Sequence, residues 1–248
     1  FLQSGFAGMD APILQDVLQI ENVNIANASS VYAIPIAHYV FSQILRWNKR
    51  IDHHIEYQQS KNWAPIAGDG ELTNKTLVIL GYGGIGSQVA KLGKAFGMRV
   101  TGIRRNPQDD EHADEVLGLD RFEELLPLTD YLVLSLPDSP QTRDIINADI
   151  LEKINSSAML INVGRGTAIN EDDLTDALND GKIAAAALDT TKVEPLDANS
   201  SLWMAKNCFI SAHDSAHSLL SLERAFELFF QNIKNIKNGD QIVNLYSE

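Results

Sequence analysis

The chain has 248 residues, with 20 Lys and Arg against 33 Asp and Glu, a formal net charge of −13 and a pI near 4.8. This acidic balance argues against a nucleic-acid surface, which needs a basic patch. Hydrophobic residues make up 44% and charged residues 21%, which is enough for an ordinary core and excludes a disordered chain. No apolar run approaches the ~18 residues of a membrane span. The single cysteine, Cys208, cannot form an internal disulfide, and this predicts a cytoplasmic location.

The first regular element that the pattern predicts is a helix from Ser29, where apolar residues recur at helical spacing. Ser29 or Ser30 is expected to cap it, and Pro35 fits its early turns. Residues 49–76 are polar and are expected to form irregular surface.

Beyond residue 76 the pattern alternates between short apolar runs and helical periodicity. Strands are expected at 77–80, 99–103, 131–136, 159–163, 184–188 and 209–211. Helices are expected at 87–96, 121–126, 148–153 and 171–179, and an amphipathic helix at 219–236 closes the chain. We expect the apolar stripe of that last helix to pack into a core. Strands that alternate with helices predict an α/β fold with a parallel sheet and right-handed crossovers.

A glycine motif, LVILGYGGIG, lies between the first of these strands and the following helix. Gly81 permits a tight turn, Gly83 leaves room for a pyrophosphate, and Gly86 permits close packing of the helix on the strand. Main-chain N–H groups at the helix start then face the phosphates. A plain glycine-rich turn is the alternative interpretation, but the strand–loop–helix–strand context favours dinucleotide binding.

The residues after the second strand select between the two nicotinamide cofactors. An NAD enzyme places a carboxylate there for the ribose 2′-hydroxyl, whereas an NADP enzyme needs cations for the 2′-phosphate. This chain has GIRRNP, with Arg104 and Arg105 at that position, and two guanidinium groups can grip a phosphate. The sequence therefore predicts that NADP(H) is preferred, with NAD(H) possible, although an exposed basic pair is common on any surface.

Four further stretches identify a family when they are taken with the glycine motif. They are LPDSPQTRDIIN (136–147), LINVGRGTAINEDDLTDAL (160–178), AALDTTKVEPL (186–196) and ISAHDSA (210–216). From about Ser4 to the C-terminus, the chain closely resembles the D-isomer-specific 2-hydroxyacid dehydrogenase family. The resemblance implies a Rossmann-type, doubly wound parallel sheet inserted into a smaller flavodoxin-like substrate domain, with the active site in the cleft between them.

The resemblance also implies how the chain is divided. Residues 1–28 are expected to be a remnant of the substrate domain, 29–217 the dinucleotide-binding domain, and 218–248 a helix that returns to the substrate domain. The family's chain begins with a further sheet-forming stretch, so Phe1 is expected not to be the natural N-terminus.

Three residues match the family's catalytic positions: Arg165, Glu194 and His213. An imidazole with a pKa near neutral suits proton transfer to a carbonyl oxygen. A buried carboxylate beside it would stabilise its protonated form, and an arginine would hold the substrate carboxylate. Taken singly, each residue also has an ordinary structural interpretation, but all three are predicted at strand ends, where ligands bind in such folds.

The same resemblance implies the residues that contact the ligands. Cofactor positions are Gly81, Gly83, Gly84, Ile85, Gly86, Arg104, Arg105, Asn106, Leu136, Pro137, Thr142, Val163, Gly164 and Asp189, the last for the nicotinamide amide. Ala7 and Gly8 are expected to receive the substrate carboxylate through their N–H groups, with Phe6 shaping the pocket.

Four positions depart from the family pattern: Ala212 where proline is usual, Asp214 and Thr190 where apolar residues are usual, and His38 where glutamate is usual. Asp214 is expected to affect the pH behaviour of His213. The remaining histidines (His53, His54, His112 and His217) match no motif, and no Cys/His cluster has metal-ligand spacing, so no metal is predicted.

The leading hypothesis is an NADP(H)-dependent reductase of small 2-oxo acids, glyoxylate- or hydroxypyruvate-like, that acts as a homodimer through the nucleotide domain, with Trp47 contributing. Two alternatives remain open: a sensor or co-repressor-like protein that binds NAD(P) without turnover, and a bare structural fragment.

Overall fold

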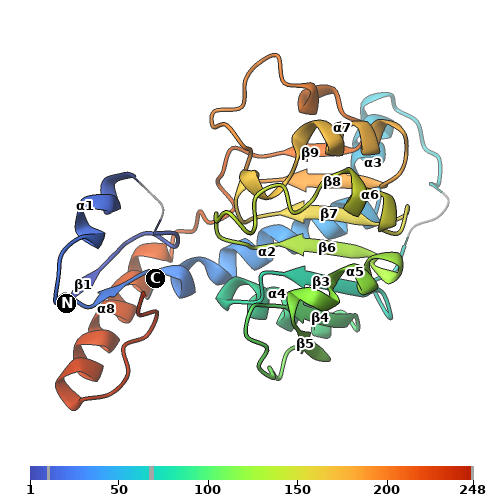
Figure 1. Cartoon of the computed structure of the whole chain (residues 1–248). Coiled ribbons are helices and arrows are strands. Elements are labelled where there is room, and N and C mark those ends of the chain that lie inside the picture. The colour runs from blue at the N-terminus through green and yellow to red at the C-terminus, as the bar shows by residue number, and fades with distance from the viewer. Residues whose placement is uncertain (10–11, 67–69, 247–248) are drawn as a thin grey trace.

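A computed structural model of the chain describes residues 1–9, 12–66 and 70–246. Within them, parallel strands form a seven-stranded sheet in the order β5-β4-β3-β6-β7-β8-β9 (Figure 1). The strands are β3 (Thr76–Leu80), β4 (Arg99–Ile103), β5 (Glu115–Leu117), β6 (Tyr131–Leu134), β7 (Met159–Asn162), β8 (Ala185–Leu188) and β9 (Cys208–Ile210). The chain runs outward from β3 to one edge, returns to β6 beside β3, and then runs to the other edge. The predicted doubly wound α/β class is confirmed.

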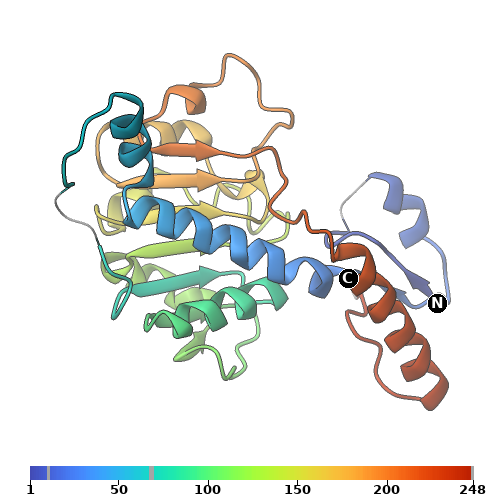
Figure 2. The ribbon, with the colours of Figure 1, turned by 180° about the vertical axis from the view of Figure 1, so that it is seen from behind.

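Helices cover both faces of the sheet, and its strands are therefore buried on both sides. The long helix α2 (Ser29–Asn48) and α4 (Gly84–Ala95) pack on one face, where β3 contributes Leu77 and Ile79 to a buried cluster. On the other face lie α5 (Phe122–Leu125), α6 (Ala148–Lys153) and α7 (Glu171–Asn179), with Val78 and Leu80 in a second cluster. Figure 2 shows α2 and α4 crossing the first face.

A smaller lobe lies at one end of α2. It contains the parallel pair β1 (Leu2–Gln3) and β2 (Ile25–Ala26), the short turns η1 (Pro12–Leu14) and α1 (Gln15–Leu18), and the C-terminal helix α8 (Ser221–Asn238) (Figure 1). Asn232, which is fully buried, joins α8 to this lobe by donating to Gln3 Oε1 (2.9 Å) and accepting from the Val243 N–H (2.8 Å). The division into segments 1–28, 29–217 and 218–248 remains a prediction.

The prediction that the apolar stripe of the last helix packs into a core is wrong. Leu222 is 68% exposed, Phe226 54% and Phe230 59%, and the described buried residues of α8 are Asn232 and Asn235. The physical reason is the size of the lobe, because a two-stranded sheet of two-residue strands is too narrow to cover an 18-residue helix.

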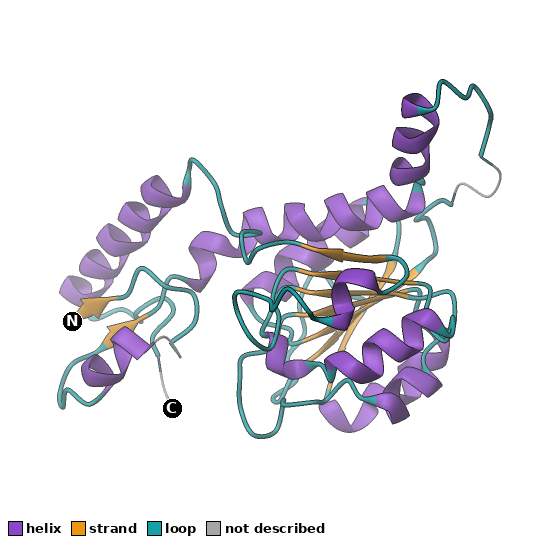
Figure 3. Ribbon diagram, turned by 90° about the horizontal axis from the view of Figure 1, so that it is seen from above, coloured by secondary structure: helices purple, strands orange, loops and turns teal. Residues whose placement is uncertain are grey.

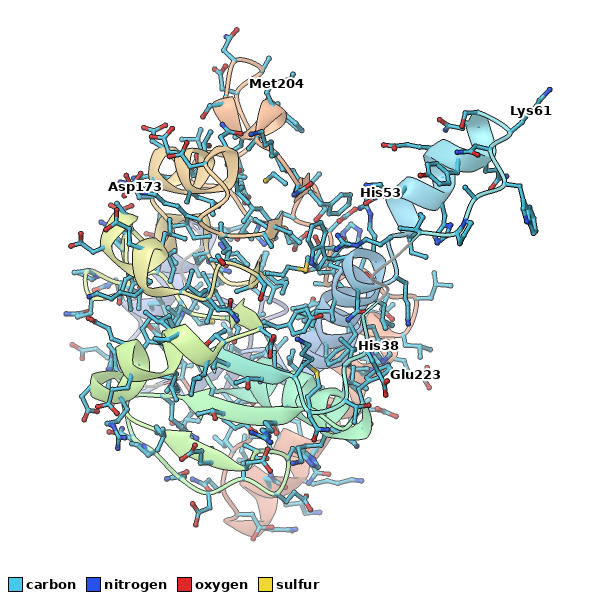
Figure 4. All side chains as sticks on the ribbon, turned by 90° about the vertical axis from the view of Figure 1, so that its right-hand side faces the viewer. His38, His53, Lys61, Asp173, Met204 and Glu223 are labelled. Atoms are coloured by element: carbon cyan, nitrogen blue, oxygen red, sulfur yellow. The ribbon has the colours of Figure 1, made fainter. Side chains whose placement is uncertain are left out.

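The prediction of irregular surface over 49–76 is also wrong in part, and its residues 67–69 lie outside the described ones. Helix α3 (Ile51–Gln59) occupies the start of this stretch, and none of its described residues is buried. A helix without a buried stripe has no apolar periodicity to reveal it. Together with residues 60–66 it forms an arm that projects from the body (Figures 3 and 4), with His53 near its base and Lys61 at its outer end.

Several boundaries differ from the predicted ones. Helix α4 begins within the glycine motif, with Gly83 as its N-cap, rather than at residue 87. The predicted serine caps are absent from α2, whose N-cap is Ala28, and Asn27 Oδ1 accepts the Ser29 N–H instead. Strand β5 was not predicted, because three residues at a sheet edge give little pattern.

The remaining predicted elements lie within two residues of the observed ones, apart from 121–126, where 3₁₀ turns η2 (Leu119–Arg121) and η3 (Leu126–Leu128) flank α5. Two further 3₁₀ turns are η4 (Gly166–Ala168) and η5 (Ser201–Met204). Among the described residues, none of the helices combines the length and apolar composition of a membrane span.

Candidate active site

The glycine loop joins β3 to α4 at the point where the strand order reverses, which is where ligands bind in such sheets. Gly81 has φ +99°, and a Cβ there would lie 2.7 Å from the Ser135 carbonyl carbon. A Cβ on Gly86 would lie 3.0 Å from the Gly81 carbonyl oxygen, a tight contact, so helix and loop pack closely here. Gly83 and Gly84 face open space. The loop therefore fits the pyrophosphate of a dinucleotide.

The two arginines predicted to select NADP lie directly beside this loop. The Ile103 carbonyl at the end of β4 accepts the N–H groups of both Gly81 (3.0 Å) and Tyr82 (2.8 Å). Arg104 follows at once, and its own N–H donates to the Leu117 carbonyl at the end of β5. Arg105 and Asn106 are exposed. These contacts place the main chain of Arg104 next to the glycine loop.

A second loop, residues 136–143, lies alongside the first. Thr142 Oγ1 donates to the Pro137 carbonyl (2.8 Å) and accepts from the Ser139 N–H (2.9 Å), so this hydroxyl shapes the loop. Gly164 packs against the main chain of Leu136, which is 2.7 Å from where a Cβ would lie. Leu136, one of the predicted cofactor residues, thus lies next to the Val163–Gly164 pair.

Sequence reasoning missed Asp138 in this loop. Its carboxylate accepts from Arg143 through two nitrogens (2.8 and 3.0 Å) and from Thr167 Oγ1 (2.7 Å), and it also lines the site cavity. Hydrogen bonds from Arg143 and then from Thr167 lower the pKa of Asp138 to about 2. The sequence feature that could have revealed this ion pair is the spacing of the acid and the arginine in DSPQTR, residues 138–143.

The predicted catalytic histidine and glutamate meet at the far end of the same sheet edge. His213 Nδ1 lies 2.8 Å from Glu194 Oε2, while Glu194 Oε1 accepts the Thr191 N–H (3.1 Å). This pairing leaves Nε2 as the ring nitrogen available to a ligand. Glu194 was expected to be buried, but 39% of its side chain is exposed because it stands on a surface turn; His213 is 47% exposed.

Arg165 follows β7, and its loop is fixed by the main chain around it. Asn162 Nδ2 donates to the Arg165 carbonyl (3.0 Å), and Arg165 Nη1 donates to the Gly164 carbonyl (3.0 Å). Gly166 lies against the Thr191 carbonyl with no room for a Cβ. This contact holds the Arg165 loop beside the segment that carries Glu194.

A cavity of about 860 Å³ joins these groups between the two lobes. Its lining includes eight predicted residues: Ala7, Gly8, Ile85, Val163, Arg165, Asp189, Glu194 and His213, together with the pocket-shaping Phe6. The other predicted cofactor residues are outside this lining: Gly81, Gly83, Gly84, Gly86, Arg104, Arg105, Asn106, Leu136, Pro137, Thr142 and Gly164.

Sequence reasoning also missed Tyr32 and Lys192 in the cavity wall. Tyr32 OH donates to the Gly5 carbonyl (2.7 Å), and the Ala28 N–H donates to the Phe6 carbonyl (2.8 Å). Helix α2 therefore anchors the loop that carries Ala7 and Gly8. Tyr32 belongs to no motif used for the prediction, whereas Lys192 lies within AALDTTKVEPL (186–196) but was not singled out there.

The four departures from the family pattern fall at different depths. The Asp214 side chain is exposed, and its N–H donates to Asp189 Oδ1 (3.1 Å). Thr190 is 2% exposed, and its hydroxyl is buried without a hydrogen-bond partner. Ala212 is exposed beside His213, and His38 is exposed on α2 (Figure 4).

Fold and site together define a dinucleotide-binding oxidoreductase, with a histidine–carboxylate pair at the cofactor edge of its sheet. Residues 41–215 match the model of the D-isomer specific 2-hydroxyacid dehydrogenase NAD-binding domain. The chain belongs to the D-isomer specific 2-hydroxyacid dehydrogenase family.

Individual relatives agree. The chain is 33% identical over 233 residues to the glyoxylate reductase of Aeropyrum pernix, covering 90% of this chain and 69% of that protein. A family member from Aeromonas salmonicida superposes with a TM-score of 0.87 at 33% identity, over 99% of this chain and 77% of that one. The NADPH-dependent glyoxylate/hydroxypyruvate reductase of Sinorhizobium meliloti, solved with NADP and sulfate, gives a TM-score of 0.85 at 25% identity, over 99% and 78%.

Gly83→Val tests whether the glycine loop holds the cofactor. Because a Cβ at this extended position meets nothing within 4 Å, the variant is expected to keep its melting temperature. Its side chain would occupy the pyrophosphate space and weaken NADPH binding about tenfold or more. Calorimetric titration with NADPH measures this, and unchanged affinity would contradict the assignment. Gly81→Ala, at positive φ against the main chain, is expected to lower the melting temperature instead.

Proposed function

We propose that this protein reduces a small 2-oxo acid, of the glyoxylate or hydroxypyruvate kind, to the D-2-hydroxy acid with NADPH. The observation that carries the proposal is the His213–Glu194 pair, 2.8 Å apart, which shares one cavity with Arg165 and Asp189. The names of the relatives from Aeropyrum and Sinorhizobium support the substrate class.

The side chains divide the chemistry among them. NADPH, when bound against the glycine loop, supplies the hydride for the carbonyl carbon. His213 delivers the proton from Nε2 to the carbonyl oxygen, and Glu194 accepts from Nδ1–H and stabilises the imidazolium. The Arg165 guanidinium holds the substrate carboxylate and polarises the carbonyl. The N–H groups of Ala7 and Gly8 receive the carboxylate from the smaller lobe.

Removing the proton donor is the first test of this mechanism. His213→Asn is expected to lower kcat for hydroxypyruvate by about a hundredfold or more, because proton transfer by a positioned imidazole contributes at least that much. NADPH affinity is expected to stay within about twofold of the parent protein, because the ring faces the substrate rather than the dinucleotide. His54→Asn on α3 is the matched control. Undiminished turnover by His213→Asn would contradict the assignment, whereas NADPH binding without turnover by the parent protein would favour a sensor.

Replacing the first arginine tests the cofactor preference. Arg104→Asp is expected to weaken NADPH about tenfold or more and to favour NADH, since a carboxylate repels the 2′-phosphate and accepts from a 2′-hydroxyl. Lys91→Asp, exposed on α4, makes the same change in net charge and serves as control. The ratio of kcat/KM values for the two cofactors measures the effect. An unchanged ratio in Arg104→Asp would mean that this residue does not contact the phosphate.

The protein is further proposed to be a cytoplasmic homodimer. The single cysteine, Cys208, is a partly buried free thiol, which is consistent with a reducing compartment. Exposed apolar residues on the arm support the dimer: Ile51 is 43% exposed, Ile55 48%, and Trp63 fully exposed. The arm continues from α2, which carries Trp47. Exposed apolar residues that gather on one projecting arm are stabilised when a second copy covers them.

Sedimentation measures this association directly. The parent chain is expected to sediment as a dimer, and Ile55→Asp as a monomer at low micromolar concentration, because the substitution places a charge in the covered surface. His54→Asp, one residue away on α3, is the control for charge on the arm. A dimer that persists in Ile55→Asp would place the interface elsewhere.

A further inference from the structure

We infer that Tyr39 on α2 and Ser211 after β9 are positioning residues that orient the Asp189 carboxylate toward the cofactor's nicotinamide. They form a hydrogen-bonded relay, Tyr39–Ser211–Asp189, that runs from α2 to the cavity wall. The inference rests on the proposed function, because it assigns these two residues a task in binding the reactive end of NADPH.

The relay is continuous and short. Tyr39 OH lies 2.7 Å from Ser211 Oγ, and Ser211 Oγ lies 2.7 Å from Asp189 Oδ1. Asp189 is 1% exposed at the end of β8, yet it lines the cavity. Helix α2 presents Tyr39 on the same face as Arg46, seven residues on, and the Arg46 guanidinium stacks over the Phe209 ring of β9 at 3.9 Å. Two independent contacts therefore hold this face of α2 against the end of β9.

The direction of each hydrogen bond follows from the carboxylate. The Asp189 carboxylate can only accept hydrogen bonds, so Ser211 donates its one hydroxyl proton to Oδ1. Ser211 then accepts, and Tyr39 must be the donor. Burial raises the pKa of Tyr39 to about 12, which keeps that proton in place. The relay has one orientation and ends on a single oxygen.

The two carboxylate oxygens consequently have different surroundings. Oδ1 accepts from Ser211 Oγ (2.7 Å), from the Asp214 N–H (3.1 Å) and from the Ser215 N–H (3.2 Å). Oδ2 has the Ser215 N–H (3.2 Å), shared with Oδ1, as its described partner. Oδ2 thus keeps lone pairs for a further donor, and the carboxamide NH₂ of a nicotinamide is a donor of the right kind.

The same carboxylate also holds the turn that carries His213. The Asp214 and Ser215 N–H groups bind its Oδ1, and the His213 N–H donates to the Asp189 carbonyl (2.9 Å). His213 has φ +53°, a conformation that costs a non-glycine residue energy and needs support from its neighbours. A carboxylate that rotates would therefore release both the nicotinamide and the histidine turn.

The experiment compares two probes in the full chain. NADPH carries the nicotinamide, whereas 2′,5′-ADP carries only the adenosine and phosphate part. Ser211→Ala is expected to weaken NADPH about tenfold and Tyr39→Phe about threefold, because a hydrogen bond to a charged group is lost or weakened. Both variants are expected to bind 2′,5′-ADP as the parent does. In the double variant, NADPH affinity is expected to match that of Ser211→Ala alone, since Tyr39 acts only through Ser211.

Two control variants separate positioning from stability. Tyr131→Phe removes another buried tyrosine hydroxyl, which accepts from Asn48 Nδ2 (2.9 Å) at the opposite end of the sheet, and should change neither affinity. Ser211→Thr keeps the hydroxyl and is expected to restore NADPH binding. Equal losses for NADPH and 2′,5′-ADP, or no loss for NADPH, would overturn the inference. If the parent binds NADPH but reduces no 2-oxo acid, the proposed function fails while these affinities still decide the relay.

Discussion

The carboxyl ends of β7, β8 and β9 lie side by side because the three strands are parallel and in register. Asn162 pairs with Leu188, and Leu188 pairs with Ile210, so the residues that follow each strand leave the sheet at one edge. Arg165, Asp189 and His213 come within three residues of those ends. The glycine loop leaves the same edge after β3. Strand register therefore assembles the site from segments that are more than a hundred residues apart in sequence.

Register brings the loops together, and polar contacts then fix their conformations. The buried Asp189 carboxylate captures the turn after β9, the Asn162 amide captures the loop after β7, and Gly166 allows that loop to press against Thr191. These contacts determine which atoms face the cavity. Helix α2 connects the two lobes. Its Tyr39 hydrogen-bonds at the edge of the large sheet, and its Tyr32 holds the loop of the smaller lobe.

Most of the large sheet was predictable, because its buried strands are apolar runs bounded by glycine and polar residues. The glycine loop followed from its motif between a strand and a helix, and the His213–Glu194 pairing was implied by the resemblance to the family. Elements with no buried stripe were not predictable: α3 exposes every face, and β5 is three residues long. The exposed face of α8 was mispredicted because amphipathicity reports a preference for burial, not the presence of a covering surface. Asp138, Tyr32 and Tyr39 join the site through side-chain contacts across the fold, which periodicity does not encode.

In the proposed reaction, NADPH delivers a hydride to one face of a 2-oxo acid that Arg165 holds, and His213 protonates the carbonyl oxygen. Reduction of hydroxypyruvate with NADPH deuterated at C4, on the transferred face, tests it directly, with the product resolved by chiral chromatography and mass spectrometry. The expected product is D-glycerate that carries one deuterium at C2. An L-product, or a product without deuterium, would contradict it.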